Sequence, residues 1–287
     1  MKQYATVHRH IRWLSVLAAF FLLQSGGCNR PGQDASEAAQ ASGQSTAEIQ
    51  KNARARYAKV GVAEIFVPPG DVPRGGWPVV VWLHGDGGAR EDVRDFALIS
   101  VQAGFAAVSV SAPIRDDANG GWLWPPQMGF KLTQQYLVAA LAPFQEAADL
   151  NLGRVFAAGL REGGWYAMLL PAVFPDFYAG ALALGPVPFT DKLPDAPAPK
   201  DRPLAILLSA TDQRGSLVAA HFRRLWERSD VPFRSELIPP EQNSKETWIL
   251  TTLELLDWLD EHGSFRDGKF RSAAPEYPGA NLPRSSP

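Results

Sequence analysis

The chain is poor in cysteine and has no excess of charge of one sign. Cys28 is the only cysteine among its 287 residues, which excludes disulfides within one chain. The 28 basic and 30 acidic residues leave a formal net charge of -2. Because nucleic-acid binding depends on a strong positive field, we expect no nucleic-acid partner. With 46% hydrophobic and 20% charged residues, the composition is that of an ordinary globular protein. No internal repeat is visible in the sequence.

Long hydrophobic runs are missing as well. The apolar stretch near the N-terminus extends only from Trp13 to Leu23, whereas a helix that spans a bilayer needs about 20 apolar residues. Basic residues precede this stretch, and the small residues 25–27 follow it directly before Cys28. This layout predicts an export signal over residues 1–27 and argues against a permanent transmembrane helix.

Cys28 stands at the expected cleavage point, which resembles the lipobox of bacterial lipoproteins. In that family the cysteine thiol is acylated and becomes the new N-terminus. The family usually has an aliphatic residue three positions earlier, where this chain has Ser25. The resemblance implies lipidation of Cys28 and an exported protein that is anchored to a membrane of the bacterial cell envelope. The alternative is plain export to the periplasm or the medium, with one free thiol.

Two segments have the composition of connecting chain rather than of a core. Residues 28–56 are rich in Ala, Gln, Ser and Gly, and residues 271–287 are crowded with proline and small residues. We expect the first to be a flexible tether and the second to be a disordered tail. Residues 57–270 are expected to form one domain, which is long enough to bury a full hydrophobic core.

Within this domain, short apolar runs alternate with stretches of helical period. Such alternation predicts a mostly parallel sheet with helices on both faces. Functional loops are then expected beyond the carboxyl ends of the strands. The predicted strands are 60–67, 79–83, 105–110, 155–158, 180–184, 204–208 and 233–238, and the predicted helices are 92–102, 132–148, 164–174, 216–228 and 245–261.

A serine is absent from the most informative motif of the chain. Residues 159–164 read GLREGG, which is the G-x-S-x-G frame of a nucleophile elbow with Arg161 in place of the serine. A predicted strand precedes this run and a predicted helix follows it, as an elbow requires. The sequence therefore predicts the turn of a serine hydrolase without its attacking atom.

Together with residues 77–88, WPVVVWLHGDGG, this motif resembles the α/β-hydrolase superfamily, above all its small esterases, dienelactone hydrolases and polyester depolymerases. Residues 77–88 are similar to the family's third strand and His-Gly oxyanion loop. The resemblance implies an α/β-hydrolase fold, the acid of a catalytic triad at Asp212, and Asn243 at the position of the base. The residues expected to line the binding site are His84, Gly85, Asp86, Gly87, Trp122, Trp124 and Glu162.

Catalysis in this family needs a hydroxyl that attacks, an imidazole that takes its proton and a carboxylate that orients the imidazole. The guanidinium of Arg161 stays protonated and cannot attack a carbonyl, and the carboxamide of Asn243 is not basic. Only the acid, Asp212, is retained. Loss of the nucleophile or the base alone costs roughly a millionfold in the turnover of a serine protease.

We therefore expect a catalytically inactive, α/β-hydrolase-like binding or scaffold protein of the cell envelope, with no cofactor and no metal. The alternative is an active serine-esterase-type hydrolase that uses non-standard catalytic residues. Three placements of Arg161 remain open. Its side chain pairs with Asp212, or forms an anion site with the amides of residues 85–88 for a carboxylate or phosphate on a ligand, or points to solvent. The partner that we expect is a small ligand that contains a carboxylate or an ester.

Few other residues are candidates for a catalytic role. Outside the predicted signal the histidines are His84, His221 and His262. We expect His84 to shape the oxyanion loop rather than to act as a base, and the other two to lie in helices. Trp122 and Trp124 stand near prolines, where they either line an aromatic groove or plug their loop against the domain.

Overall fold

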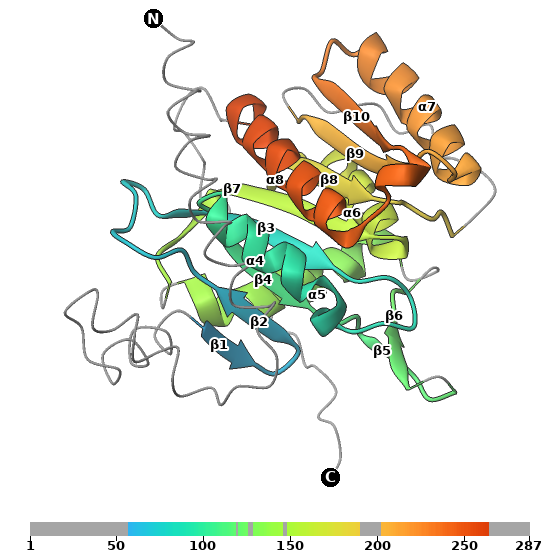
Figure 1. Ribbon diagram of the computed structural model, residues 1–287. Helices are drawn as coiled ribbons and strands as arrows, with labels where there is room; N and C mark the ends of the chain where they lie inside the picture. Colours follow the sequence, from blue (N-terminus) through green and yellow to red (C-terminus); the bar gives the residue numbers. More distant parts are fainter. Residues whose placement is uncertain (1–56, 119, 126–128, 146–147, 190–201, 264–287) are drawn as a thin grey trace, which may run out of the picture. The chain divides into compact units, whose positions relative to one another are not determined.

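The computed structural model describes residues 57–118, 120–125, 129–145, 148–189 and 202–263, which belong to one compact unit of the chain. Figure 1 shows a twisted sheet between layers of helices. The predicted export signal, the tether with Cys28, and the tail over 271–287 lie outside the described residues. Across the described part of the chain, no helix combines the length and the apolar character that a membrane span requires.

Eight strands form the main sheet, and six of them run parallel. The first two strands form an antiparallel hairpin that adds to one edge, and every other neighbouring pair of strands is parallel apart from the junction with this hairpin. The α/β fold class predicted from the sequence is confirmed. The sheet order is β1 (Tyr57–Val60), β2 (Ala63–Phe66), β4 (Ala106–Val110), β3 (Trp77–Leu83), β7 (Leu150–Leu160), β8 (Tyr178–Leu184), β9 (Leu204–Ser209) and β10 (Phe233–Ile238).

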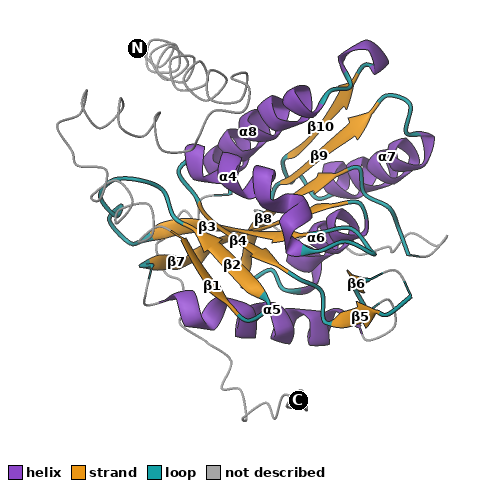
Figure 2. Cartoon of the chain, turned by 60° about the horizontal axis from the view of Figure 1, so that its bottom comes forward, coloured by secondary structure: helices purple, strands orange, loops and turns teal. Residues whose placement is uncertain are grey.

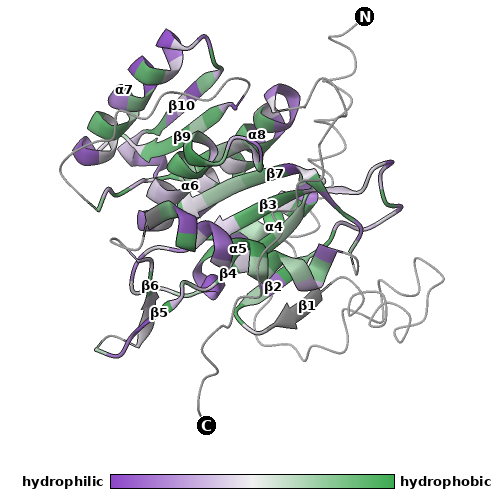
Figure 3. Ribbon diagram, turned by 180° about the vertical axis from the view of Figure 1, so that it is seen from behind, coloured by the Kyte–Doolittle hydropathy of each residue, from purple (hydrophilic) through white to green (hydrophobic). Residues whose placement is uncertain are grey.

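The central strands are apolar along their whole length because both of their faces are covered. Val79, Val81 and Leu83 of β3 belong to one hydrophobic cluster, whereas Val80 and Trp82 belong to the cluster on the opposite face. This is the alternation that the pleat of a strand imposes. In a half-exposed sheet every second residue would be polar, so the continuous apolar run identifies a strand buried on both sides. The hydropathy colouring of Figure 3 shows this apolar centre.

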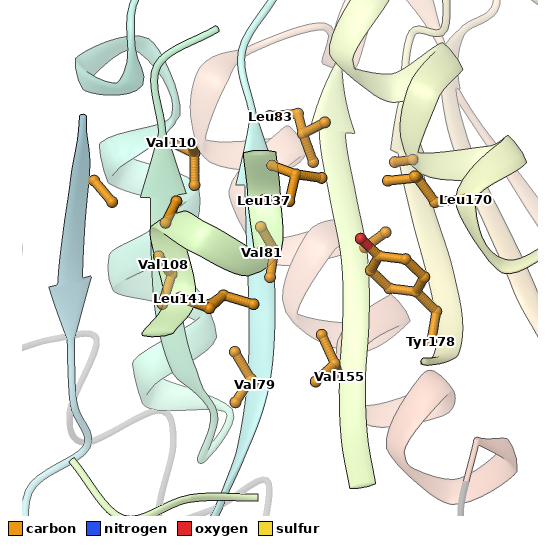
Figure 4. Packing of buried hydrophobic residues seen from close by; sticks show 14 of the residues in the cluster. Val79, Val81, Leu83, Val108, Val110, Leu137, Leu141, Val155, Leu170 and Tyr178 are labelled. Carbon is orange, nitrogen blue, oxygen red and sulfur yellow. The ribbon is translucent and has the colours of Figure 1, made fainter. Parts of the chain in front are cut away.

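Helices cover the two faces of the sheet unequally. The helices α4 (Arg94–Gln102) and α8 (Lys245–His262) contact each other and pack on one face. The opposite face is covered by α5 (Gly129–Gln145) and α6 (Glu162–Val173), and α7 (Gln213–Arg228) continues this layer beside α6. Figure 2 shows the two layers. In Figure 4, Leu137 and Leu141 of α5 lie against the valines of β3.

The structure departs from the predicted elements in two places. The strand expected over 60–67 is the β1–β2 hairpin, because Gly61 adopts a φ of +55° and turns the chain. The loop expected after β4 contains a second small hairpin, β5 (Ile114–Asp116) and β6 (Gly121–Leu123). Two short 3-10 helices complete the described elements, η1 (Arg90–Val93) and η2 (Pro240–Gln242).

Candidate functional site

The turn between β7 and α6 has the strained geometry of a nucleophile elbow. Arg161, between the last residue of β7 and the first of α6, has φ 55° and ψ -118°, a conformation that costs a non-glycine residue about 1–3 kcal/mol. Its N–H donates to the carbonyl of Leu184 at 2.9 Å, and its carbonyl accepts from Trp165 at 3.0 Å and from Val187 at 3.1 Å. These bonds hold residue 161 at the carboxyl edge of the sheet.

Two glycines permit this turn by removing side chains where backbones meet. A Cβ on Gly159 would overlap the backbone of Gly163, and a Cβ on Gly163 would overlap the carbonyl oxygens of Leu83 and His84. The start of α6 therefore lies directly against the end of β3. This contact explains the glycines on either side of Arg161 without reference to catalysis.

The side chain of Arg161 points toward solvent and lies over the oxyanion loop. It is 61% exposed, and its Nε lies 3.7 Å from Oε2 of Glu162, a side chain that is 13% exposed. The Cβ and Cδ atoms of Arg161 lie close above Gly85. Of the three placements that the sequence left open, the structure has the one in which Arg161 points to solvent. Asp212 is not paired with it among the described contacts and caps α7 by accepting from the N–H of Gly215 at 2.8 Å.

The loop after β3 is held in place by hydrogen bonds that its backbone N–H groups donate. The N–H of Asp86 donates to Oε2 of Glu162 at 3.1 Å, the N–H of Gly87 donates to the carbonyl of Trp122 at 3.0 Å, and the N–H of Gly88 donates to the carbonyl of Gly85 at 3.1 Å. Three of the four amides in the anion-site alternative, those of residues 86–88, therefore already have acceptors inside the protein in this arrangement.

Asp86 is held within the same loop. Its Oδ1 accepts from the N–H of Trp124 at 3.0 Å. Burial raises the pKa of the Asp86 carboxyl; the hydrogen bond from Trp124 opposes this shift, and the nearby carboxylate of Glu162 adds to it. The carboxylate of Asp86 thus lies near that of Glu162, the first residue of α6, whose Oε2 in turn lies 3.7 Å from Nε of Arg161.

His84 shapes this loop and is not available as a base. It is fully buried. Its Nδ1 donates to the carbonyl of Gly85 at 2.6 Å, and its Nε2 accepts from the N–H of Ala112 at 2.9 Å. These partners require the neutral imidazole with the proton on Nδ1. Burial lowers the pKa of His84 in the folded protein.

This lowered pKa predicts a loss of stability in mild acid. The unfolded chain takes up a proton on His84 below the ordinary pKa of 6.5, whereas the folded chain takes it up only at lower pH. The stability that the neutral His84 ring contributes is therefore fully present above pH 6.5. It is lost as the pH falls toward the lowered pKa of the folded protein, with a slope of at most about 1.4 kcal/mol per pH unit. Urea unfolding between pH 7 and pH 5 measures this slope. His84→Asn, which keeps a donor for Gly85, should flatten it; an identical slope in that variant would contradict the assignment.

The two tryptophans near the prolines, Trp122 and Trp124, differ in how deeply they are buried. Trp124 is fully buried, and its Nε1 donates to the carbonyl of His84 at 2.7 Å. Its ring centroid lies 5.4 Å from that of His84 and 5.9 Å from that of Tyr166. Trp122 is partly buried, and its backbone pairs with Gly88. Trp124 therefore plugs the loop against the domain, as one of the two sequence-based alternatives states.

Asn243 has a local partner that the sequence did not suggest. Its Oδ1 accepts from Nε1 of Trp248 at 2.8 Å, and the Trp248 ring lies near Gly185, which follows β8. The described hydrogen bonds and ion pairs join none of Arg161, Asp212 and Asn243 to one another. No spacing rule would find Trp248, because an indole N–H takes whichever acceptor folding brings near it.

The remaining candidates lie in ordinary structural settings. His221 lies in α7 beside Phe222, and Nδ1 of His262, in the last turn of α8, lies 2.7 Å from the carbonyl of Trp258. A serine that ends β9, Ser209, places its hydroxyl 2.8 Å from that of Thr211 and lies on no elbow turn. Within the described residues, no group of three or more His, Cys, Asp or Glu side chains could hold a metal ion.

Comparison with known proteins supports a hydrolase fold at low sequence identity. No family model matches the chain. A protein of Nocardia uniformis subsp. tsuyamanensis, named "Putative esterase NocK", is 26% identical over 132 residues, which are 43% of this chain and only 38% of that protein's length.

Two solved structures share the fold over most of the chain. The carboxylesterase of Bacillus cereus superposes with a TM-score of 0.51 at 17% identity, over 74% of this chain and 98% of that one. An S-formylglutathione hydrolase of Agrobacterium tumefaciens gives a TM-score of 0.56 at 14% identity, over 72% and 94% of the two chains. With its strained elbow and its largely parallel sheet, the chain has the α/β-hydrolase fold that these esterases share.

Proposed function

We propose that this protein is a catalytically inactive α/β-hydrolase that acts as a binding or scaffold protein. The observation that carries the proposal is Arg161 at the apex of an intact elbow, with φ 55°. The turn keeps a costly backbone conformation, yet it presents a permanently charged group that cannot attack a carbonyl. A binding protein can use such a rigid, exposed cation, whereas a serine hydrolase cannot work with it.

The surroundings of Arg161 support the same proposal. Asn243, which we assign to the position of the base, accepts a hydrogen bond from Trp248. His84, the histidine of the loop after β3, has both ring nitrogens bonded to backbone groups. Neither can take a proton from an attacking hydroxyl in this arrangement. Asp212 retains a carboxylate but uses it as a helix cap.

We propose a small molecule with a carboxylate or an ester as the ligand. The exposed guanidinium of Arg161 would hold it, because that group offers several donors to a planar acceptor. We also propose that the protein is exported to the bacterial cell envelope and is held there by a lipid on Cys28. The layout of residues 1–28 supports this location.

An active esterase is the second candidate, and the names of the similar proteins favour it. We expect the purified chain to hydrolyse short-chain nitrophenyl esters no faster than buffer and to remain unlabelled by a fluorophosphonate probe. The reason is that residue 161 offers no nucleophile. Steady-state absorbance and gel fluorescence measure the two results. The control is Arg161→Ala, which should behave like the wild type in both assays. Turnover or labelling that survives in both chains would establish a nucleophile elsewhere and would refute the proposal.

A further inference from the structure

The carboxylate of Glu162 accepts a hydrogen bond from an amide of the loop after β3. Its Oε2 accepts from the N–H of Asp86 at 3.1 Å. The amides of Gly87 and Gly88 in the same loop donate instead to carbonyls of β6 and of the loop itself. The N–H of Asp86 is therefore directed at the side chain of the residue after Arg161.

This amide has a defined role when the same fold catalyses hydrolysis. There the oxyanion hole consists of the N–H of the residue after the nucleophile and one N–H from the loop after the third central strand. In this chain these positions correspond to the N–H of Glu162, in the first turn of α6, and the N–H of Asp86. Helix first-turn amides have no acceptor within the helix. Glu162, which supplies one of the two N–H donors, thus uses its own side chain to occupy the other donor, the N–H of Asp86.

The guanidinium of Arg161 helps to hold the carboxylate of Glu162 at this amide. Its Nε lies 3.7 Å from the same Oε2 of Glu162, so the guanidinium attracts the carboxylate that the amide also holds. A Cβ placed on Gly85 would lie 3.3 Å from Cβ and Cδ of Arg161 and 3.3 Å from Oε2 of Glu162. Both side chains therefore cover the loop at the point where a ligand oxygen would have to approach it.

We propose that Glu162 is an internal ligand of the oxyanion position, which keeps an external carbonyl or carboxylate oxygen from the Asp86 amide. This inference deepens the proposed function and rests on it for its biological meaning. It adds a second reason for the absence of hydrolysis, independent of the missing serine. It also restricts the proposed ligand to contacts with the guanidinium of Arg161 for as long as Glu162 occupies the amide.

Amide hydrogen exchange on the full chain, followed by NMR, tests whether Glu162 holds this amide. Exchange of the Asp86 N–H should be about 10- to 100-fold faster in Glu162→Ala, the ratio that corresponds to losing one hydrogen bond to a charged acceptor. Glu162→Gln keeps an acceptor oxygen and should stay close to the wild type. The internal control is the Gly88 amide, which donates to Gly85 and should not change. Equal acceleration of both amides would reduce Glu162 to a general support of the loop and would overturn the proposal.

Titration with sodium butyrate tests whether Glu162 excludes an external oxygen. The Asp86 amide signal should move with butyrate in Glu162→Ala and stay fixed in the wild type, with Arg161 present in both chains. Equal responses in the two chains, whether both move or neither does, would overturn the proposal. Hydrolysis of nitrophenyl esters by the wild type would refute the proposed function instead, and the exchange ratio would still decide the role of Glu162.

Discussion

Replacing Gly163 with alanine should destabilise the protein by about 3 kcal/mol or more. The same change in an exposed helix would stabilise it, because alanine is the better helix former by about 1 kcal/mol. Here the sign is reversed, since the added Cβ would overlap the carbonyl oxygens of Leu83 and His84. Backbone atoms of a central strand cannot rotate away as a side chain can, so α6 would have to move off β3 and take the elbow with it.

Urea unfolding followed by circular dichroism measures this effect. The matched control is Gly61→Ala, at a residue with φ +55° and no described atom within 4 Å of the position of its Cβ. That variant carries only the backbone penalty of a left-handed conformation, about 1–2 kcal/mol. If Gly163→Ala lost no more stability than this control, the close packing of α6 against β3 would be ruled out.

Replacing Trp124 with alanine should cost about 3–5 kcal/mol, the usual range for removing a buried aromatic side chain. Trp124 is fully buried, and its indole N–H supplies the hydrogen bond to the carbonyl of His84 at 2.7 Å. The variant leaves a cavity beside Tyr166 and an unpaired carbonyl under the oxyanion loop. Thermal unfolding measures the loss.

Two further variants separate the contributions at this position. Trp124→Phe keeps most of the ring and removes the N–H, so it should lose about 1–3 kcal/mol, the cost of an unsatisfied buried acceptor. Trp122→Ala should lose less than Trp124→Ala, because the Trp122 side chain is only partly buried. A loss below about 1 kcal/mol in Trp124→Ala, with altered ligand binding, would instead assign Trp124 to a ligand groove.

The loop over residues 84–88 is held by contacts with several parts of the protein. The His84 ring and the Trp124 indole bond to backbone groups, the N–H groups of Gly87 and Gly88 donate to backbone carbonyls, and the N–H of Asp86 donates to the side chain of Glu162. None of these contacts requires a serine at position 161. The conformation of the loop therefore does not depend on a serine at the elbow, and the binding function proposed above could use it unchanged.

Much of the fold could be predicted from the sequence because the signals were local. The apolar run 79–83 becomes a strand buried on both faces, and the glycines around Arg161 form the elbow that their spacing indicates. The hairpin β5–β6 was missed because strands of three residues are too short to show a period. The predictions for the export signal, the tether and Cys28 fall outside the described residues and stay predictions.

The sequence by itself determined which groups are present: an arginine without nucleophilic character at the elbow, an asparagine where the family resemblance expects the base, and a sheet with apolar strands. Only the tertiary structure decided which partners these groups take. Arg161 could reach a carboxylate on another loop or the one beside it, and the direction of its side chain over Gly85 selects Glu162. Likewise Asp212 caps its own helix. Such choices depend on the distances between separate loops after folding, and composition, period and spacing along the chain do not contain them.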